Sequence, residues 1–111
     1  AIHYFIAKRD SMIDNESRDT LLDSVMQDET VDSEKKRTAK MDIEHLLSLM
    51  PNRRYVYVIR RLVLQEAEPK VVAQELKTNV DNLYNIKKRA IAALTEIALK
   101  EVEKYEKEIS K

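Results

Sequence analysis

The chain of 111 residues contains no glycine, no cysteine and no tryptophan, and its only prolines are Pro51 and Pro69. Glycine and proline mark turns and strand ends, so their scarcity disfavours a β-rich fold. The lack of cysteine excludes disulfides, thiol nucleophiles and thiolate metal ligands. Leu, Ala, Glu and Lys, which favour helices, are plentiful. The composition therefore predicts an all-α chain.

Long apolar runs are also missing from the sequence. No stretch approaches the roughly 20 apolar residues that cross a bilayer, and the N-terminus does not resemble a signal peptide. We therefore expect a cytoplasmic protein without a membrane partner. With 43% hydrophobic residues, the chain can bury one modest core.

The sequence also lacks the patterns of an enzyme. It has no glycine-rich phosphate loop and no recognisable Ser-His-Asp constellation, and His3 and His45 are far apart in the sequence. Acidic pairs such as Asp14 and Glu16 have no neighbours that would exclude water or shift their pKa. We expect no catalytic residues, no metal site and no cofactor.

The formal net charge is zero, but the charges are unevenly distributed. Residues 14–34 contain eight acidic residues and one basic residue, whereas residues 53–89 contain nine basic residues and four acidic ones. We therefore divide the chain into residues 1–37, a short helix followed by an acidic linker, and residues 38–111, a helical domain. A basic domain with an acidic arm can bind a polyanion in spite of a neutral total.

The apolar spacing in the second domain predicts helices that pack as a small bundle. We expect one helix before Pro51, one over residues 52–65, one beginning near Glu68, and a last helix that Asn79 caps and that continues beyond Ala98 as a solvated tail. The apolar residues that recur at helical spacing before the proline are Met41, Ile43, Leu46, Leu47 and Met50.

In the last helix, a rotation of about 100° per residue separates an apolar face from a polar face. Leu83 and Ala90 define the apolar face, whereas Asn85 lies opposite, near Lys88 and Arg89. A helix with amides and bases on its outer side is suited to a DNA groove. The same residue types also occur on ordinary solvated helices, so this pattern alone leaves both interpretations open.

Several residues fall at a consistent spacing over residues 46–97. They are Met50 and Pro51 before a helix, Val72, Ala73 and Leu76 in the next, Val80 after a turn, and then Asn82, Tyr84, Asn85, Ile86, Lys88, Arg89, Ala90 and Leu94. With these residues the segment resembles region 4 of sigma-70 family RNA polymerase sigma factors, particularly the small extracytoplasmic-function type. Region 4 is the C-terminal promoter-recognition domain of that family.

The resemblance implies a helix-turn-helix whose second helix reads a promoter element of the −35 type in the major groove of double-stranded DNA. It also implies docking on the RNA polymerase core through the flap of the β subunit, with an anti-sigma factor as a candidate partner. Asn82 and Asn85 suit adenine, and Lys88 and Arg89 can reach phosphate or guanine. The DNA-binding residues that we predict are Lys70, Asn79, Asp81, Asn82, Tyr84, Asn85, Lys88 and Arg89.

The sequence departs from the family pattern in three places. Lys77 stands in the turn where the family often has glycine, so it either adopts a left-handed conformation or the turn follows another path. The helix after Pro51 is one residue longer than the usual spacing. Near the N-terminus, only a fragmentary similarity to the end of region 2 is present, so we expect an excised C-terminal portion or a stand-alone region 4 protein. The residues of that fragment are Ile6, Ala7, Asp10, Ile13 and Asp14.

A second hypothesis is a helical interaction protein, for instance a dimerising transcriptional regulator whose last helix pairs with a partner. Val102, Tyr105 and Ile109 offer a weak apolar stripe for such pairing. Response-regulator effector domains end in a similar arrangement of helices, so a transcriptional activator lies between the two hypotheses. Exposure of the stripe would favour pairing.

Overall fold

The computed structural model describes residues 33–109, and all regular structure in that range is helical. The elements are α4 (Ser33–Ser48), α5 (Arg53–Ile59), the π-helical segment η1 (Arg60–Leu64), α6 (Pro69–Glu75) and α7 (Val80–Ile109). The predicted all-α bundle is therefore confirmed. The helix expected near the N-terminus and most of the acidic linker lie outside the described residues.

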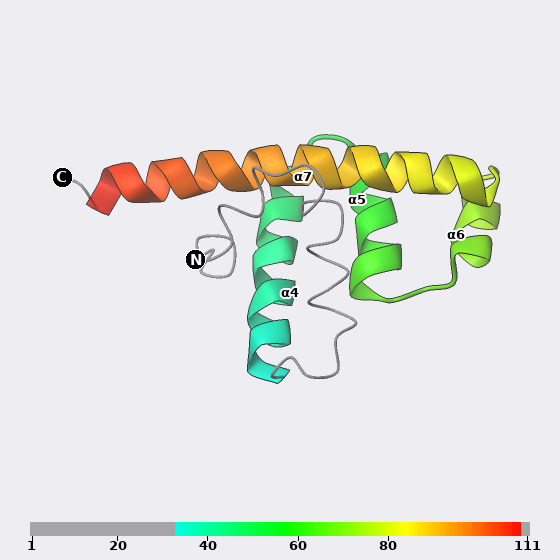
Figure 1. Ribbon diagram of the computed structural model, residues 1–111, viewed down its shortest axis with the longest axis horizontal. Coiled ribbons are helices and arrows are strands. Elements are labelled where there is room, and N and C mark those ends of the chain that lie inside the picture. The colour runs from blue at the N-terminus through cyan, green and yellow to red at the C-terminus, as the bar shows by residue number, and fades with distance from the viewer. Residues whose placement is uncertain (1–32, 110–111) are drawn as a thin grey trace.

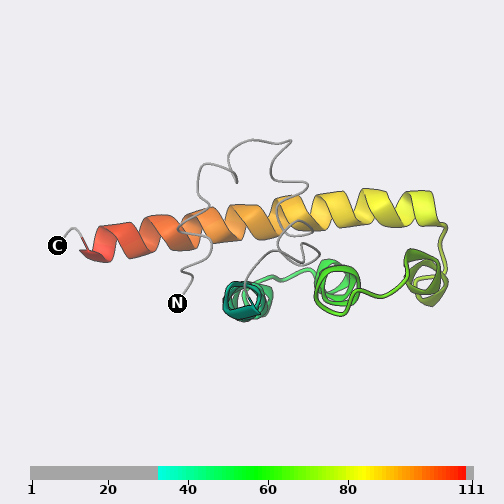
Figure 2. The same ribbon diagram turned by 60° about the horizontal axis from the view of Figure 1, so that its bottom comes forward.

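Helix α7 is the longest element, and the other helices lie along one side of it. Figure 1 shows α4 and α5 crossing α7 at a steep angle, with α6 near its N-terminal end. In Figure 2, α4, α5 and α6 form a row beneath α7. The C-terminal turns of α7 extend past α4 (Figure 1). The bundle is thus built on one long helix that every other helix approaches from the same side.

Helix α4 begins at Ser33, ahead of the boundary expected at residue 38, and ends at Ser48, shortly before Pro51. Most of the predicted apolar residues are buried, but Met41 is 65% exposed, which corrects the predicted face. Met41 precedes the buried Ile43 by two residues, so it points about 200° away from it on a helix.

Asn52 caps the N-terminus of α5. Its side-chain oxygen accepts hydrogen bonds from the backbone N–H groups of Arg54 and Tyr55, at 3.1 and 3.2 Å.

The helix predicted over residues 52–65 is present, but its second half widens into a π-helix. The N–H of Gln65 donates to the carbonyl oxygen of Arg60 over 2.9 Å, a bond that spans five residues instead of four. The segment ends at Leu64, and Glu66, two residues later, has a left-handed φ of 53°. A π-helical turn contains more residues than an α-helical turn, so η1 takes up extra chain without interrupting the helix.

The buried side chains form two hydrophobic clusters, and α7 contributes to both. The first cluster joins α4, α5, η1 and the middle and end of α7: Ala39, Ile43, Leu46, Leu47, Met50, Ile59, Val63, Ala90, Ile91, Leu94, Ala98 and Val102. The second cluster joins α5, η1, α6 and the start of α7: Val58, Leu62, Val72, Ala73, Leu83 and Ile86. Val102 is fully buried. The expectation of a wholly solvated tail beyond Ala98 is therefore wrong, because this valine belongs to the core.

Candidate nucleic-acid interface

A tight turn separates α6 from α7. The N–H of Thr78 donates to the carbonyl oxygen of Ala73 at 2.9 Å, and the N–H of Lys77 donates to that of Gln74 at 3.1 Å. This pair of bonds is the Schellman arrangement that ends many helices, and it requires a left-handed residue. Lys77 supplies it with φ of 56°, which decides between the two alternatives that the sequence left open.

Asn79 caps the N-terminus of α7, as predicted. Its side-chain Oδ1 accepts a hydrogen bond from the backbone N–H of Asn82 at 2.7 Å. Its carbonyl oxygen accepts from the N–H of Leu83 at 3.0 Å. These bonds satisfy N–H groups that have no partner within the helix. The Asn79 side-chain oxygen is thus engaged in starting the helix.

The first turns of α7 have one buried face and one exposed face. Leu83 and Ile86 are buried in the second cluster and Ala90 is buried in the first. The opposite face is exposed and polar, with Asp81, Asn82, Asn85, Lys88 and Arg89. The expected exposure of the surface around Asn85 is confirmed. Because the inner face is fixed by packing, the position of the outer face is also fixed.

The two amides on this exposed face differ in their surroundings. The Nδ2 of Asn82 donates to the hydroxyl oxygen of Thr78 at 2.7 Å, which ties the amide to the turn. Among residues 33–109, no side chain holds Asn85 in this way. The hydrogen bond therefore defines the orientation of the Asn82 amide, whereas no such bond within the described part of the chain orients that of Asn85.

The other predicted residues lie at the edges of this face. Tyr84 is 49% exposed and borders a hollow of about 380 Å³ together with Pro69 and Lys87. Lys70 is exposed in the first turn of α6. The structure thus brings Tyr84 to the junction between α7 and the start of α6.

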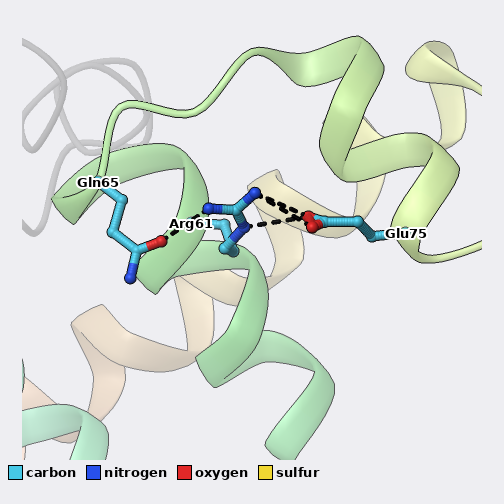
Figure 3. Close-up of polar contacts among 3 residues, drawn as sticks. All are labelled: Arg61, Gln65 and Glu75. Atoms are coloured by element: carbon cyan, nitrogen blue, oxygen red, sulfur yellow. Dashed lines mark hydrogen bonds and ion pairs between the residues drawn. The ribbon is translucent and has the colours of Figure 1, made fainter.

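A polar cluster that the sequence did not reveal joins η1 to α6. In Figure 3 the guanidinium of Arg61 points toward Glu75 on one side and Gln65 on the other. Arg61 Nε and Nη2 donate to the two carboxylate oxygens of Glu75 at 3.0 and 3.1 Å, and Nη1 donates to Gln65 Oε1 at 2.8 Å. Arg61 and Glu75 lie far apart in the sequence, so no local pattern could predict this pair.

The surroundings of this cluster shift the pKa values of its members. A hydrogen bond from the Tyr57 hydroxyl, followed by the bond and charge of Arg61, lowers the pKa of Glu75. The same hydrogen bond raises the pKa of Tyr57. The hydrogen bond to Glu75 likewise raises the pKa of Arg61. These shifts favour the ionised carboxylate and guanidinium at neutral pH, so the cluster holds α6 against η1 as a charged pair.

A second ion pair joins η1 to another helix: Arg60 pairs with Glu44 of α4 at 2.9 Å.

Metal sites, membrane spans and known relatives would be further indications of function. Residues 33–109 contain no group of three or more His, Cys, Asp or Glu side chains that could hold a metal ion. None of the helices in this range combines the length and apolar character that a membrane span requires. Comparisons of the chain with protein-family models, curated proteins and solved structures gave no match.

Proposed function

We propose that this chain is a sequence-specific DNA-binding module of a sigma-like transcription initiation factor. In this proposal, α6 and α7 act as a helix-turn-helix, and the first turns of α7 enter the major groove at a promoter element of the −35 type. The observation that carries the proposal is a set of exposed polar residues, in which Asn85 lies opposite the buried Leu83 and Ala90, and Asn82 and Arg89 adjoin it on one flank. Packing holds that set rigidly on a helix end.

The chemistry of the exposed face suits the edges of bases. The major groove is wide enough for a helix, and an asparagine amide can pair with both N6 and N7 of adenine. Arg89 can pair with guanine or contact phosphate, and Lys88 and Lys70 supply positive charge for the backbone. Tyr84 can contact a thymine methyl group. The proposed module needs no cofactor, since recognition rests on these side chains.

Two local features support the sigma-like assignment. Lys77 adopts the left-handed conformation at the turn position where the family often has glycine. The helix after Pro51, which is one residue longer than the family spacing, contains the π-helical segment η1. A wider turn of this kind accommodates one added residue while the flanking apolar residues keep their direction. The proposed partners are promoter DNA, the RNA polymerase core at the β flap, and an anti-sigma factor.

The alternative of a dimerising regulator has less support. Of the stripe expected to pair, Val102 is fully buried within the chain itself, and the side chain of Ile109 lies outside the described residues. Tyr105 alone is exposed on this stripe within the described residues, at 38%. One exposed tyrosine does not form a coiled-coil seam.

The first test is selection of binding sites from a pool of randomised double-stranded DNA, followed by mobility-shift titrations of the selected duplex at two salt concentrations. We expect a preferred sequence and a steep loss of affinity with salt. Asn85→Ala should lower the preference by about tenfold, and Arg89→Ala should weaken binding and reduce the salt slope by about one.

Lys100→Ala is the matched control, because it also removes one exposed positive charge from α7. It lies about 16 Å further along the helix than Arg89, beyond the proposed contact. The proposal fails if the protein shows no sequence preference at low salt, or if Lys100→Ala reduces affinity as much as Arg89→Ala. A pull-down with RNA polymerase core then separates a sigma-like factor, which binds core, from an independent DNA-binding regulator, which does not.

A further inference from the structure

We infer that Thr78 is a positioning residue for base recognition, which acts by holding the Asn82 amide in the orientation that reads adenine. The inference rests on the proposed DNA-binding function and adds a specificity determinant to it. It starts from one contact, the hydrogen bond of 2.7 Å from Asn82 Nδ2 to the Thr78 hydroxyl oxygen. Thr78 lies in the turn, whereas Asn82 lies on the exposed face of α7.

The turn fixes the position of the Thr78 hydroxyl. The backbone N–H of Thr78 is bound to the carbonyl oxygen of Ala73, and the next residue, Asn79, caps α7. Threonine is also branched at Cβ, which restricts its χ1 angle. Its hydroxyl oxygen is therefore an acceptor held in a fixed position between the end of α6 and the start of α7.

The contact with Thr78 leaves the groups of the Asn82 amide that can pair with adenine available. An asparagine side chain has two N–H donors on nitrogen and an oxygen that accepts. One N–H is directed to Thr78, so one N–H and the oxygen Oδ1 remain. Adenine presents N7, which accepts, and the N6 amino group, which donates. The remaining groups of Asn82 are thus the pair that adenine requires.

Pre-ordering of this amide should improve discrimination between sequences. A free side chain must be ordered when it binds a specific base, and this ordering weakens the specific complex. In a nonspecific complex held by phosphates, the amide needs no fixed orientation. Loss of the Thr78 contact should therefore lower the affinity for the preferred sequence and leave nonspecific affinity unchanged. Asn85 has no comparable anchor among residues 33–109.

The test compares Thr78→Val, which keeps the branched shape but removes the acceptor, with Thr78→Ser, which keeps the acceptor. For each variant we would measure the ratio of affinities for the selected duplex and for duplexes in which each A·T pair is replaced by G·C. We expect Thr78→Val to lower this ratio at one A·T pair by about two- to tenfold, with the salt slope unchanged. Thr78→Ser should retain most of the wild-type ratio, because it keeps the acceptor and loses only the restriction that the branch at Cβ places on χ1.

Two controls show whether Thr78 acts through Asn82. In an Asn82→Ala background, Thr78→Val should have no further effect on the ratio, as expected for one coupled pair. Thr95→Val removes a different threonine hydroxyl, which lies in α7 and donates to the carbonyl oxygen of Ile91 inside the core, and it should leave the ratio unchanged.

Failure of the inference can be distinguished from failure of the proposed function. If wild-type protein prefers no duplex sequence, the DNA-reading function fails and Thr78 has nothing to position. If wild-type protein reads a sequence but Thr78→Val keeps the full ratio, the positioning role alone is wrong. Equal losses in Thr78→Ser and Thr78→Val would also overturn it, because the hydroxyl would then not be the group that matters.

Discussion

Within residues 33–109 of this glycine-free chain, two residues hold left-handed backbone conformations at the ends of helical segments. Glu66 follows η1 with φ of 53°, and Lys77 follows α6 with φ of 56°. For a residue with a Cβ atom this conformation costs roughly 1–2 kcal/mol. At Lys77, two backbone hydrogen bonds across the turn compensate for that cost. The turn between α6 and α7 is therefore specified by its helix ends and not by a permissive residue.

Replacement of Lys77 by glycine should stabilise the fold. Glycine removes the clash of the Cβ atom, although its greater freedom in the unfolded chain cancels part of the gain. We expect Lys77→Gly to raise the free energy of unfolding by about 0.5–1 kcal/mol, measured by urea titration. Lys77→Ala is the control, since it removes the charge but keeps the Cβ atom. Equal stability of the two variants would show that the conformation carries no strain.

At the scale of elements, the sequence predicted helix positions where single residues determine them. Within a helix, Pro69 fits only the first turn, and Asn79 is a strong cap, so the start of α6 and the start of α7 followed from local chemistry. The π-helical form of η1 did not follow, because its apolar residues do not distinguish it from an α-helix. Met41 was wrongly assigned to the buried face of the helix before Pro51, because it is apolar and close in sequence to the residues that form this face.

Part of the candidate site could also be predicted from the sequence, and part could not. The exposed face around Asn85 followed from helical rotation and from the buried Leu83. The engagement of Asn82 by Thr78 did not, because it depends on the path of the turn. The pair of Arg61 and Glu75 joins two elements whose approach no local pattern encodes. Contacts that form only when the elements come together were thus the part of the site that could not be predicted from the sequence.

The pair of Arg61 and Glu75 should make stability depend on pH. The pKa of Glu75 is lowered in the folded protein, first by the Tyr57 hydroxyl and then by Arg61. Its stabilising contribution is therefore present above the unfolded pKa of about 4.3 and is lost as the pH falls through the folded value. We expect the stability difference between wild-type protein and Glu75→Gln to shrink as the pH is lowered from 7 through this range, in urea titrations at each pH.

Two further variants test the cause of this pH dependence. Tyr57→Phe removes the hydroxyl that bonds to Glu75, so it should flatten part of the same dependence. Glu108→Gln, at an exposed position near the end of α7, controls for the loss of one negative charge. An unchanged difference between wild-type and Glu75→Gln across the acidic range would mean that the carboxylate gains nothing from its partners.

At the scale of the whole molecule, α7 is shared by both hydrophobic clusters. Leu83 belongs to the second cluster and Leu94 to the first, and Tyr55 of α5 packs against both. Figure 2 shows that α4, α5 and α6 all approach α7 from the same side. The polar face of the first turns of α7 is therefore supported by the cluster beneath it and, through the continuous helix, by the cluster further along.

This sharing predicts that the described part of the chain unfolds in one cooperative transition. Leu83→Ala and Leu94→Ala each remove a fully buried side chain and should each lower the free energy of unfolding by about 2–5 kcal/mol. In both variants, denaturation followed by far-UV circular dichroism and by tyrosine fluorescence should give coincident curves. Met41→Ala is the control, because an exposed apolar side chain should change stability by no more than about 0.5 kcal/mol. Separate transitions in Leu83→Ala would mean that α6 and the start of α7 melt alone, and the exposed face would then lack the rigid support on which base recognition depends.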